Sequence, residues 1–490
     1  MSNDRHTAPE DRIPLFAKIA YGLGAFVNNL LAAAVGGMTI VLNLGLGLSP
    51  TLVGWLGAIP RVTDALTDPL MGYISDNTRS RWGRRRPYIF LGAILSGVLF
   101  AALWQLPEGK SDMFYFWYFL GLSMVFYLAY TCYATPWVAL GYELTPDYHE
   151  RTRLMGIQNA IGQIAYIVAP WFLAIMQHKT FDGDLAKGAA RLALLIGAVT
   201  IIFGTLPALL LEERVEGQAL VTADPPPPRG FLDNMKDFAS GFLITLKSRP
   251  FQLLCVATFL VFNGFILISS FQSYVIIYYV FGGNLELGSE YVGYSGSLGA
   301  VSTFIVIAVV TFMSARLGKR RAFFWAIGIS MVGYGLKWFC YDPDVPNLLL
   351  IPAPLMAFGL GGLFTLMPSM VADVCDMDEL ETGARREGMF GSIFWWVVKV
   401  GMAAALAGGG MLLDATGFNV DLGGEQSEST ILLLRIFDAL IPVLASAIAI
   451  LAVYAYPITE ERALEIRDEL EERRGAVSPS AEAPSEQPAT

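Results

Sequence analysis

Long apolar runs recur along the whole chain, and they limit its possible folds more than any other feature. A helix needs about 20 consecutive apolar residues to cross the hydrocarbon core of a bilayer. Charged residues make up only 16% of this chain, whereas about 25% is usual in soluble proteins. We therefore predict an all-α membrane protein with twelve transmembrane helices. They are expected at roughly 15–46, 51–76, 87–106, 113–142, 153–177, 190–211, 250–281, 291–315, 321–341, 347–371, 387–413 and 430–456.

Basic residues are concentrated in the loops that follow even-numbered segments. The loops after odd-numbered segments contain few, apart from one near residue 110 and a group within 179–191. Because cytoplasmic loops carry an excess of Lys and Arg, both termini are expected on the cytoplasmic side. The richest of these loops follows the second segment and contains Arg79, Arg81, Arg84, Arg85 and Arg86.

One long polar break divides the chain into two halves. It runs over 212–249, includes four consecutive prolines, and ends in an amphipathic stretch. The domains are expected to be an N-terminal six-helix bundle (1–211), a cytoplasmic middle loop (212–249), a C-terminal six-helix bundle (250–457) and a cytoplasmic tail (458–490), disordered at its end. The Gly-Arg-Arg-Arg sequence at 83–86 resembles Gly-Lys-Arg-Arg at 318–321. Two repeated halves are typical of secondary transporters, whose sites lie near mid-membrane between the halves.

Three charged residues interrupt the second segment. Asp64 and Asp68 follow Arg61 by three and seven residues, so all three share one face of a helix. Each costs about 2.5–3.5 kcal/mol at the centre of a membrane helix, so they predict a polar cavity. Two carboxylates one turn apart repel, and one of them favours a proton or a cation. Lys399 lies in another apolar run and needs a carboxylate partner. The competing interpretation is a static ion pair between the halves.

A group of residues between the second and third segments resembles the loop signature of the major facilitator superfamily. Such a loop can latch two helices on the cytoplasmic side. Simple membrane topology would also explain the arginines, but it does not explain the aspartate at its spacing. The expected latch consists of Gly72, Asp76, Gly83, Arg84, Arg85 and Arg86.

A closer resemblance extends over most of the chain. The chain is similar to the glycoside–pentoside–hexuronide:cation symporter family. The similar stretches are RVTDALTDPLMGYISDNTRSRWG in and after the second segment, YGLGAF in the first and VVKVG in the eleventh. The resemblance implies a coupling cation, Na⁺ or H⁺, and no other cofactor or metal. It implies that the cation is bound by Asp64, Asp68, Thr131 and Lys399.

The substrate positions depart from the family pattern. The best-known member of the family holds its sugar with two aspartates and an arginine, and the alignment places Asn29, Ala134 and Asn159 there. Amides still form hydrogen bonds, so a polar substrate remains expected. Among all candidates, Arg61 suits an anionic or polar substrate group best. The predicted substrate-binding residues are Asn28, Asn29, Arg61, Tyr130, Trp137, Gln158, Asn159, Asn263, Gln272, Trp395 and Trp396.

These residues predict a cation-coupled symporter of a sugar, glycoside or uronide that works by alternating access. The family also resembles the vertebrate sodium-dependent lysolipid transporters, so an amphipathic cargo is the alternative, and proton-coupled sucrose or maltose carriers are a neighbouring one. The sequence contains no HExxH or GxSxG motif, either of which would indicate an enzyme, and an enzyme is therefore not expected. The expected partners are a small molecule and the lipid bilayer, without nucleic acid, and the protein is expected to be a monomer. The resemblance implies a multi-pass protein of a bacterial inner (plasma) membrane.

Overall fold

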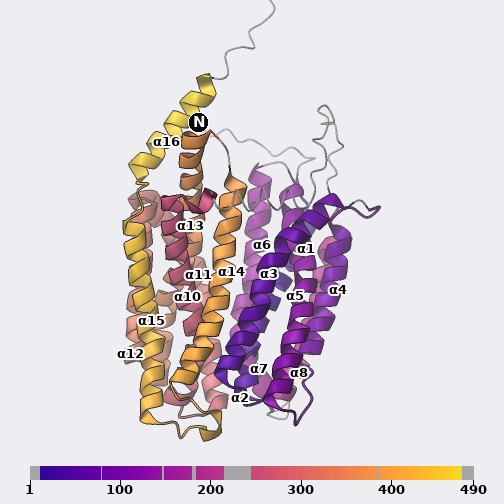
Figure 1. Ribbon diagram of the computed structural model, residues 1–490, viewed down its shortest axis with the longest axis vertical. Helices are drawn as coiled ribbons and strands as arrows, with labels where there is room; N and C mark the ends of the chain where they lie inside the picture. Colours follow the sequence, from indigo (N-terminus) through magenta and orange to yellow (C-terminus); the bar gives the residue numbers. More distant parts are fainter. Residues whose placement is uncertain are drawn as a thin grey trace, which may run out of the picture.

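The chain forms long helices in two bundles that stand side by side (Figure 1). The computed structural model describes residues 12–78, 80–145, 148–178, 184–213, 244–383 and 386–476. The first bundle contains α1 (Leu15–Met38), α2 (Ile40–Leu44), α3 (Pro50–Asn77), α4 (Arg86–Leu103), α5 (Asp112–Glu143), α6 (Tyr148–Val168), η2 (Ala169–Trp171), α7 (Phe172–Gln177) and α8 (Leu185–Leu210).

The second bundle repeats this plan after the middle loop. Most of that loop, including most of its amphipathic stretch, lies outside the described residues, as do both chain ends. The second bundle contains α10 (Arg249–Tyr274), the π-helical η4 (Val275–Val280), α11 (Leu285–Leu317), α12 (Lys319–Cys340), η5 (Pro346–Leu350), α13 (Pro352–Thr382), α14 (Glu387–Ala415), η6 (Val420–Leu422) and α15 (Glu428–Tyr454), and is followed by α16 (Glu460–Ala476).

The predicted fold class, an all-α membrane protein, is confirmed. The unusual helix in it is α3, because it carries charged residues along its middle. Within the described residues, eleven spans are long and apolar enough to cross a membrane, and α3 is not among them. It has 28 residues, which is ample length, but Arg61, Asp64 and Asp68 lower its hydropathy. In Figure 1 it runs alongside the other helices of its bundle. A helix that spans despite such charges must place them against protein or water.

The two bundles are joined most tightly at one end. We call the end that carries α16 the tail end, and the opposite one, where α2 and α7 lie, the far end (Figure 1). At the far end the Tyr274 hydroxyl donates to Asn43 Oδ1 at 2.7 Å, and the Thr51 amide donates to Asp414 Oδ2 at 3.0 Å. One hydrophobic core runs through the first bundle and on into the ends of α10 and α15. A second core lies within the C-terminal bundle.

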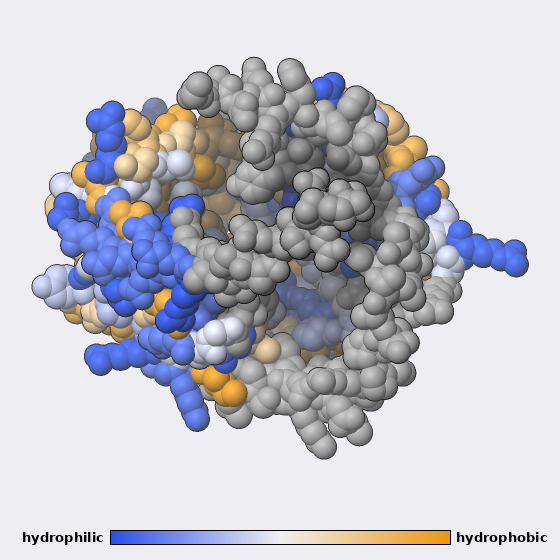
Figure 2. Space-filling model, turned by 90° about the horizontal axis from the view of Figure 1, so that it is seen from above, coloured by the Kyte–Doolittle hydropathy of each residue, from blue (hydrophilic) through white to orange (hydrophobic). Residues whose placement is uncertain are grey.

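Glycines bring α3 and α14 into backbone contact near the far end. A Cβ atom on Gly54 would lie 2.6 Å from the Leu406 carbonyl oxygen, and one on Gly410 would lie 3.0 Å from the Gly54 Cα. Such small residues let membrane helices approach closely. The middles of the two helices are thereby held opposite one another across the boundary between the bundles. Figure 2 looks onto the tail end and shows a hollow near the middle of that face.

Candidate cation and substrate site

Two carboxylates from α3 and one ammonium from α14 meet across the boundary between the bundles. Lys399 Nζ lies 3.0 Å from Asp64 Oδ2 and also makes an ion pair with Asp68 Oδ2. The side chain of Asp64 is only 2% exposed, whereas those of Asp68 and Lys399 are 32% and 30% exposed. The cluster therefore has one sealed carboxylate and one that faces open space.

Threonines of α5 support both carboxylates. Thr131 Oγ1 donates to Asp64 Oδ1 at 3.0 Å, and Thr135 Oγ1 donates to Asp68 Oδ1 at 3.3 Å. Thr67 Oγ1 lies 3.3 Å from Thr131 Oγ1. Thr131 was predicted from the sequence, whereas Thr135 was not. The signal was available, because Thr135 follows Thr131 by one helical turn, as Asp68 follows Asp64.

The four residues predicted to bind the cation are thus brought together by three helices. Carboxylate and hydroxyl oxygens are ligands that hard cations favour. The Lys399 ammonium lies between the two carboxylates, in the place that a bound cation would share. A cation and this ammonium would compete for the same oxygens. The arrangement can therefore exchange one positive charge for another.

Arg61 lies one turn before Asp64 and is 9% exposed. Its guanidinium carbon lies 5.0 Å from the centroid of the Tyr127 ring. Within the described part of the chain it makes no hydrogen bond or ion pair. Its neighbour Tyr130 is engaged, because that hydroxyl donates to Asn28 Oδ1 at 2.8 Å. Arg61 is therefore a largely buried donor without a hydrogen-bond acceptor among the described residues.

Four other predicted substrate residues lie on α1 and α10. Asn28 Nδ2 donates to Asn29 Oδ1 at 3.4 Å on α1. The Asn263 amide is buried beside Gly401 and has no hydrogen-bond partner among the described residues. Gln272 donates to the hydroxyl of Ser295 at 3.2 Å.

The remaining predicted residues are placed differently. Trp137 is 2% exposed and stacks on Tyr21 inside the first bundle, with 5.0 Å between ring centroids. The structure does not bring it to the aspartates. Trp395 is 54% exposed and stacks on Phe364. Three others have no described contact to the aspartates, namely the half-buried Gln158 and the exposed Asn159 and Trp396.

The predicted latch forms a tight turn at the start of α4. Gly83 has a φ of 99°, which a residue with a side chain rarely adopts. Arg84 and Arg85 both make ion pairs with Glu143 at the end of α5. Arg86 Nε donates to the Ala208 carbonyl at 2.7 Å. Gly72 lies against α5, and the side chain of Asp76 lies outside the described residues.

A second carboxylate, from the residues after α8, also holds this loop, and neither it nor Glu143 was predicted from the sequence. Glu213 accepts hydrogen bonds from the amides of Arg84, Arg85 and Arg86 at 2.8, 2.8 and 2.9 Å. These amides lie at the start of α4, where a helix has unsatisfied donors and a positive dipole end. The turn is therefore closed by acids from α5 and from the residues after α8.

The C-terminal bundle has the same construction, which extends the internal repeat. Gly318 has a φ of 80° at the start of α12. Lys319 Nζ lies 2.7 Å from Asp373 Oδ1 of α13, as the arginines of the first bundle pair with Glu143 of α5. A Cβ atom on Gly318 would lie 2.6 Å from Glu460 Oε2, so this carboxylate sits at α12 as Glu213 sits at α4.

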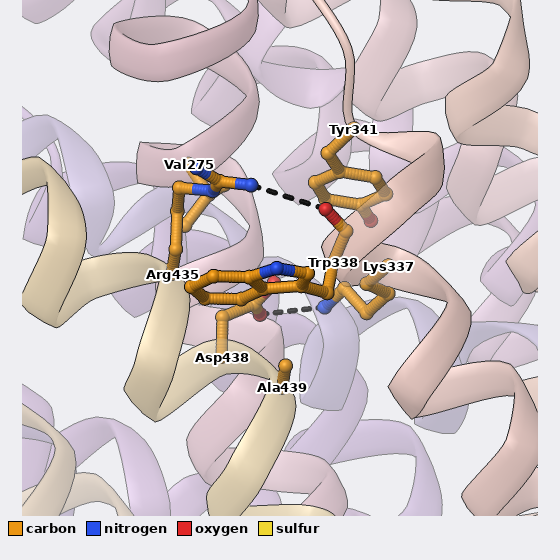
Figure 3. Close-up of a pocket in the computed structure, with 7 residues that line it drawn as sticks. All are labelled: Val275, Lys337, Trp338, Tyr341, Arg435, Asp438 and Ala439. Atoms are coloured by element: carbon orange, nitrogen blue, oxygen red, sulfur yellow. Dashed lines mark hydrogen bonds and ion pairs between the residues drawn. The ribbon is translucent and has the colours of Figure 1, made fainter.

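A second Lys–Asp pair lies buried inside the C-terminal bundle and was not predicted. Lys337 Nζ of α12 lies 2.5 Å from Asp438 Oδ1 of α15 (Figure 3). Their side chains are 1% and 2% exposed. Beside them is a cavity of about 10 Å³, enough for roughly one water molecule. Arg435 donates to the Trp338 carbonyl at 3.0 Å and stacks on the Trp338 ring at 4.4 Å.

Comparison with known proteins gives a consistent result along the chain. The family model for MFS/sugar transport proteins matches residues 20–460. An uncharacterized symporter of Synechocystis sp. is 25% identical, over 95% of this chain and 98% of that protein. A glucuronide carrier protein homolog of Escherichia coli is 22% identical, over 93% and 95%. A sodium-dependent lysophosphatidylcholine symporter of Gallus gallus is 22% identical, over 98% and 94%.

Solved structures share the fold at low identity. A bacterial homologue of the human lysosomal transporter Spinster, in an inward-facing conformation, matches with a TM-score of 0.64 and 16% identity. The match covers 92% of this chain and 98% of that chain. A D-xylose–proton symporter matches with a TM-score of 0.61 and 13% identity, over 91% and 98%. At these identities the likeness concerns the major facilitator fold alone.

Proposed function

Because this chain belongs to the MFS/sugar transport protein family, we propose that it couples the movement of a sugar, glycoside or uronide to that of Na⁺ or H⁺. The resemblance to the glycoside–pentoside–hexuronide:cation symporters is confirmed by relatives named for glucuronides, isoprimeverose and glycosides. The protein is a multi-pass membrane transporter and not an enzyme. The observation that carries the proposal is the contact of Lys399 with both Asp64 and Asp68.

The cation binds at the oxygens that Lys399 occupies in the unloaded carrier. Thr131 and Thr135 hold the two carboxylates in place from a third helix. When the cation binds, it neutralises one carboxylate and weakens the hold of Lys399. Because Lys399 belongs to the second bundle and the aspartates to the first, this exchange loosens a bond between the bundles. Alternating access then proceeds by rocking of the bundles around this centre.

The orientation in the membrane follows from the basic loops. They put the tail end, with the Arg84–Glu143 and Lys319–Asp373 pairs, on the cytoplasmic side. The far end, where the bundles are joined by Tyr274 and Asn43, then faces outward. With this orientation, we propose that the hollow at the tail end opens to the cytoplasm of a bacterial inner membrane (Figure 2).

The static ion pair is the weaker alternative. A purely structural pair needs one carboxylate per ammonium, and here two carboxylates share one. A third of the Asp68 side chain is exposed, so water and ions have access to it. Buried ion pairs contribute little net stability compared with apolar packing. Retaining a surplus carboxylate at an accessible point is better explained by cation exchange.

A lysolipid is the second candidate substrate. The relative from Gallus gallus is named for lysophosphatidylcholine and matches 98% of this chain. The positions that hold sugars with charged side chains in the family contain Asn29, Ala134 and Asn159 here. An amphipathic solute would place its headgroup at the polar centre and its chain along apolar helix surfaces.

The test is a melting experiment on the purified protein in NaCl, LiCl and KCl at two pH values, with uptake measured in proteoliposomes. A cation that binds the native state raises the melting temperature by mass action. We expect stabilisation by the coupling cation, at least about tenfold weaker apparent affinity in Asp68→Asn, and loss of coupled uptake. Asp421→Asn, a change at an exposed loop carboxylate, is the matched control. An unchanged cation response and uptake in Asp68→Asn would refute the assignment.

A further inference from the structure

The guanidinium of Arg61 is the one strong donor at the centre that the described residues leave without an acceptor. It is nine-tenths buried, and its only described partner is the face of the Tyr127 ring. An arginine has five N–H donors in a fixed fork and no acceptor. None of the Arg61 nitrogens is among the described side-chain atoms that are fully buried without a hydrogen-bond partner, so they remain accessible. The fork can therefore take an acceptor from outside the chain.

The neighbouring carboxylate does not supply that partner. Asp64 lies three residues further along α3, but its two oxygens accept from Thr131 and Lys399. Asp68 is engaged by Lys399 and Thr135. Asp64 lies within electrostatic range of Arg61, but among the described residues no hydrogen bond or ion pair joins Arg61 to the acid–lysine cluster. Arg61 is free to bind a separate acceptor while the cluster holds its own contacts.

The wall around Arg61 is aromatic and offers a second donor. The hydroxyl of Tyr127, on the ring that Arg61 stacks against, is buried and has no hydrogen-bond partner among the described residues. Tyr130 and Tyr166 also lie within electrostatic range of Arg61. A fork of N–H groups with a hydroxyl beside it fits the oxygens of an acidic group.

The balance of charge around Arg61 and the Lys399 cluster also favours a partner with a negative charge. Arg61 and Lys399 are positive, and Asp64 and Asp68 are negative, so they balance. The buried pairs Lys337–Asp438 and Lys18–Glu150 are each balanced by themselves. A coupling Na⁺ or H⁺ then adds one uncompensated positive charge in a region where net charge is costly. A substrate with a single negative charge would restore the balance.

We propose that the transported solute carries one acidic oxyanion group, a carboxylate, sulfonate or phosphate, which binds the Arg61 fork. This inference rests on the cation-coupled function proposed above and narrows its substrate class. The planar fork matches the two oxygens of such a group in a way that a lysine would not. A water-soluble sugar acid and an acidic lysolipid share this chemistry, and the experiment distinguishes them.

The experiment measures binding to the full-length protein in NaCl and in KCl with three matched probes. Methyl β-D-glucoside is neutral, methyl β-D-glucuronide adds a carboxylate, and lysophosphatidylglycerol has a phosphodiester on a lipid. We expect one acidic probe to bind, the neutral glucoside to bind at least about 30-fold more weakly, and Arg61→Gln to weaken the acidic probe about 30-fold or more. Arg61→Lys should recover only part of this loss.

Arg435→Gln is the control variant. Arg435 also stacks on aromatic rings in a membrane helix, but it donates to the Trp338 carbonyl and lies at the separate cavity of Figure 3. The Arg435→Gln variant should bind the acidic probe with the same affinity as the wild-type protein. The Na⁺ response of Arg61→Gln reports whether the cation site is intact, which separates failure of this proposal from failure of the coupling itself.

The named outcomes all decide the proposal. Binding of the glucuronide alone supports it with a sugar acid as cargo, and binding of the lysolipid alone supports it with a lipid headgroup. Equal affinities for glucoside and glucuronide overturn it. So does an Arg61→Gln variant that binds the acidic probe as the wild type does, or a wild-type protein that binds neither acidic probe.

Discussion

Lys337 of α12 and Lys399 of α14 both lie within membrane-spanning helices and both pair with aspartate, yet their surroundings differ. Lys337 has one carboxylate, Asp438, in the same bundle, and both side chains are sealed from solvent. Lys399 has two carboxylates in the other bundle and is 30% exposed. The first pair is balanced and enclosed, and its cavity has room for about one water molecule. The second has a surplus acid and an open side.

The comparison shows that a charge in a membrane helix does not by itself indicate a transport site. An intramembrane charge is a reasonable first hypothesis of function, but Lys337 and Asp438 satisfy each other between α12 and α15. What distinguishes the Lys399 cluster is access, two carboxylates in contact with one ammonium, and a position between two bodies that must move. The following changes would break or sharpen this distinction.

The largest effect is expected from Asp438→Asn. This variant leaves the Lys337 ammonium buried without a counter-charge, which costs about 3–5 kcal/mol when one partner of a buried pair is removed. The melting temperature of the purified protein should fall sharply. The double change Lys337→Met with Asp438→Leu should restore most of it. A stable Asp438→Asn protein with abolished uptake would assign this pair to transport and end the contrast.

A smaller and salt-dependent effect is expected from Lys399→Gln. Without the ammonium, Asp64 and Asp68 repel each other, and the protein should lose about 1–3 kcal/mol in KCl. In NaCl a bound cation takes the place of the lysine and most of the loss should be recovered. Melting curves in the two salts measure this difference. Equal destabilisation in both would mean that Lys399 is structural, as Lys337 is.

The smallest effect is expected from Thr135→Val. It removes the hydroxyl that donates to Asp68 and keeps the shape of the side chain. Loss of one such hydrogen bond is worth about 1 kcal/mol, so the apparent Na⁺ affinity should fall about fivefold. Titration of the melting temperature with NaCl gives the value. Thr205→Val is the control, since Thr205 bonds only to carbonyls of its own helix, and an equal loss there would remove Thr135 from the site.

The sequence predicted the fold and the central contact for a clear physical reason. Long apolar runs define the helices, and the cost of isolated charges requires Lys399 to find a carboxylate. The same argument applies to Lys337 and Asp438, which lie in apolar segments of the same half, but Asp438 has Arg435 three residues before it in its own segment. The sequence therefore offers two partners for Asp438 and does not choose between them.

Other parts could not be predicted from the sequence. The rotation of a helix about its axis decides whether a residue faces the boundary or its own bundle, and Trp137 turns inward to stack on Tyr21. The acids that close the loops, Glu143 and Glu213, lie at helix ends and look like ordinary loop carboxylates. Only the fold brings them to the arginines, since Glu213 is 129 residues from Arg84 in the chain.

The sharing of two carboxylates by Lys399 also has a consequence for the membrane potential. Unloaded, the two carboxylates are balanced by Lys399 together with Arg61, so the centre as a whole is neutral. Loaded with one cation and one acidic solute, it is neutral again. Moving one net charge through 100 mV changes the free energy by about 2.3 kcal/mol. Because the centre is neutral both loaded and unloaded, neither the loaded nor the unloaded movement of the bundles would incur this change. The carrier would run on concentration gradients alone, at the same rate in a polarised and in a depolarised cell.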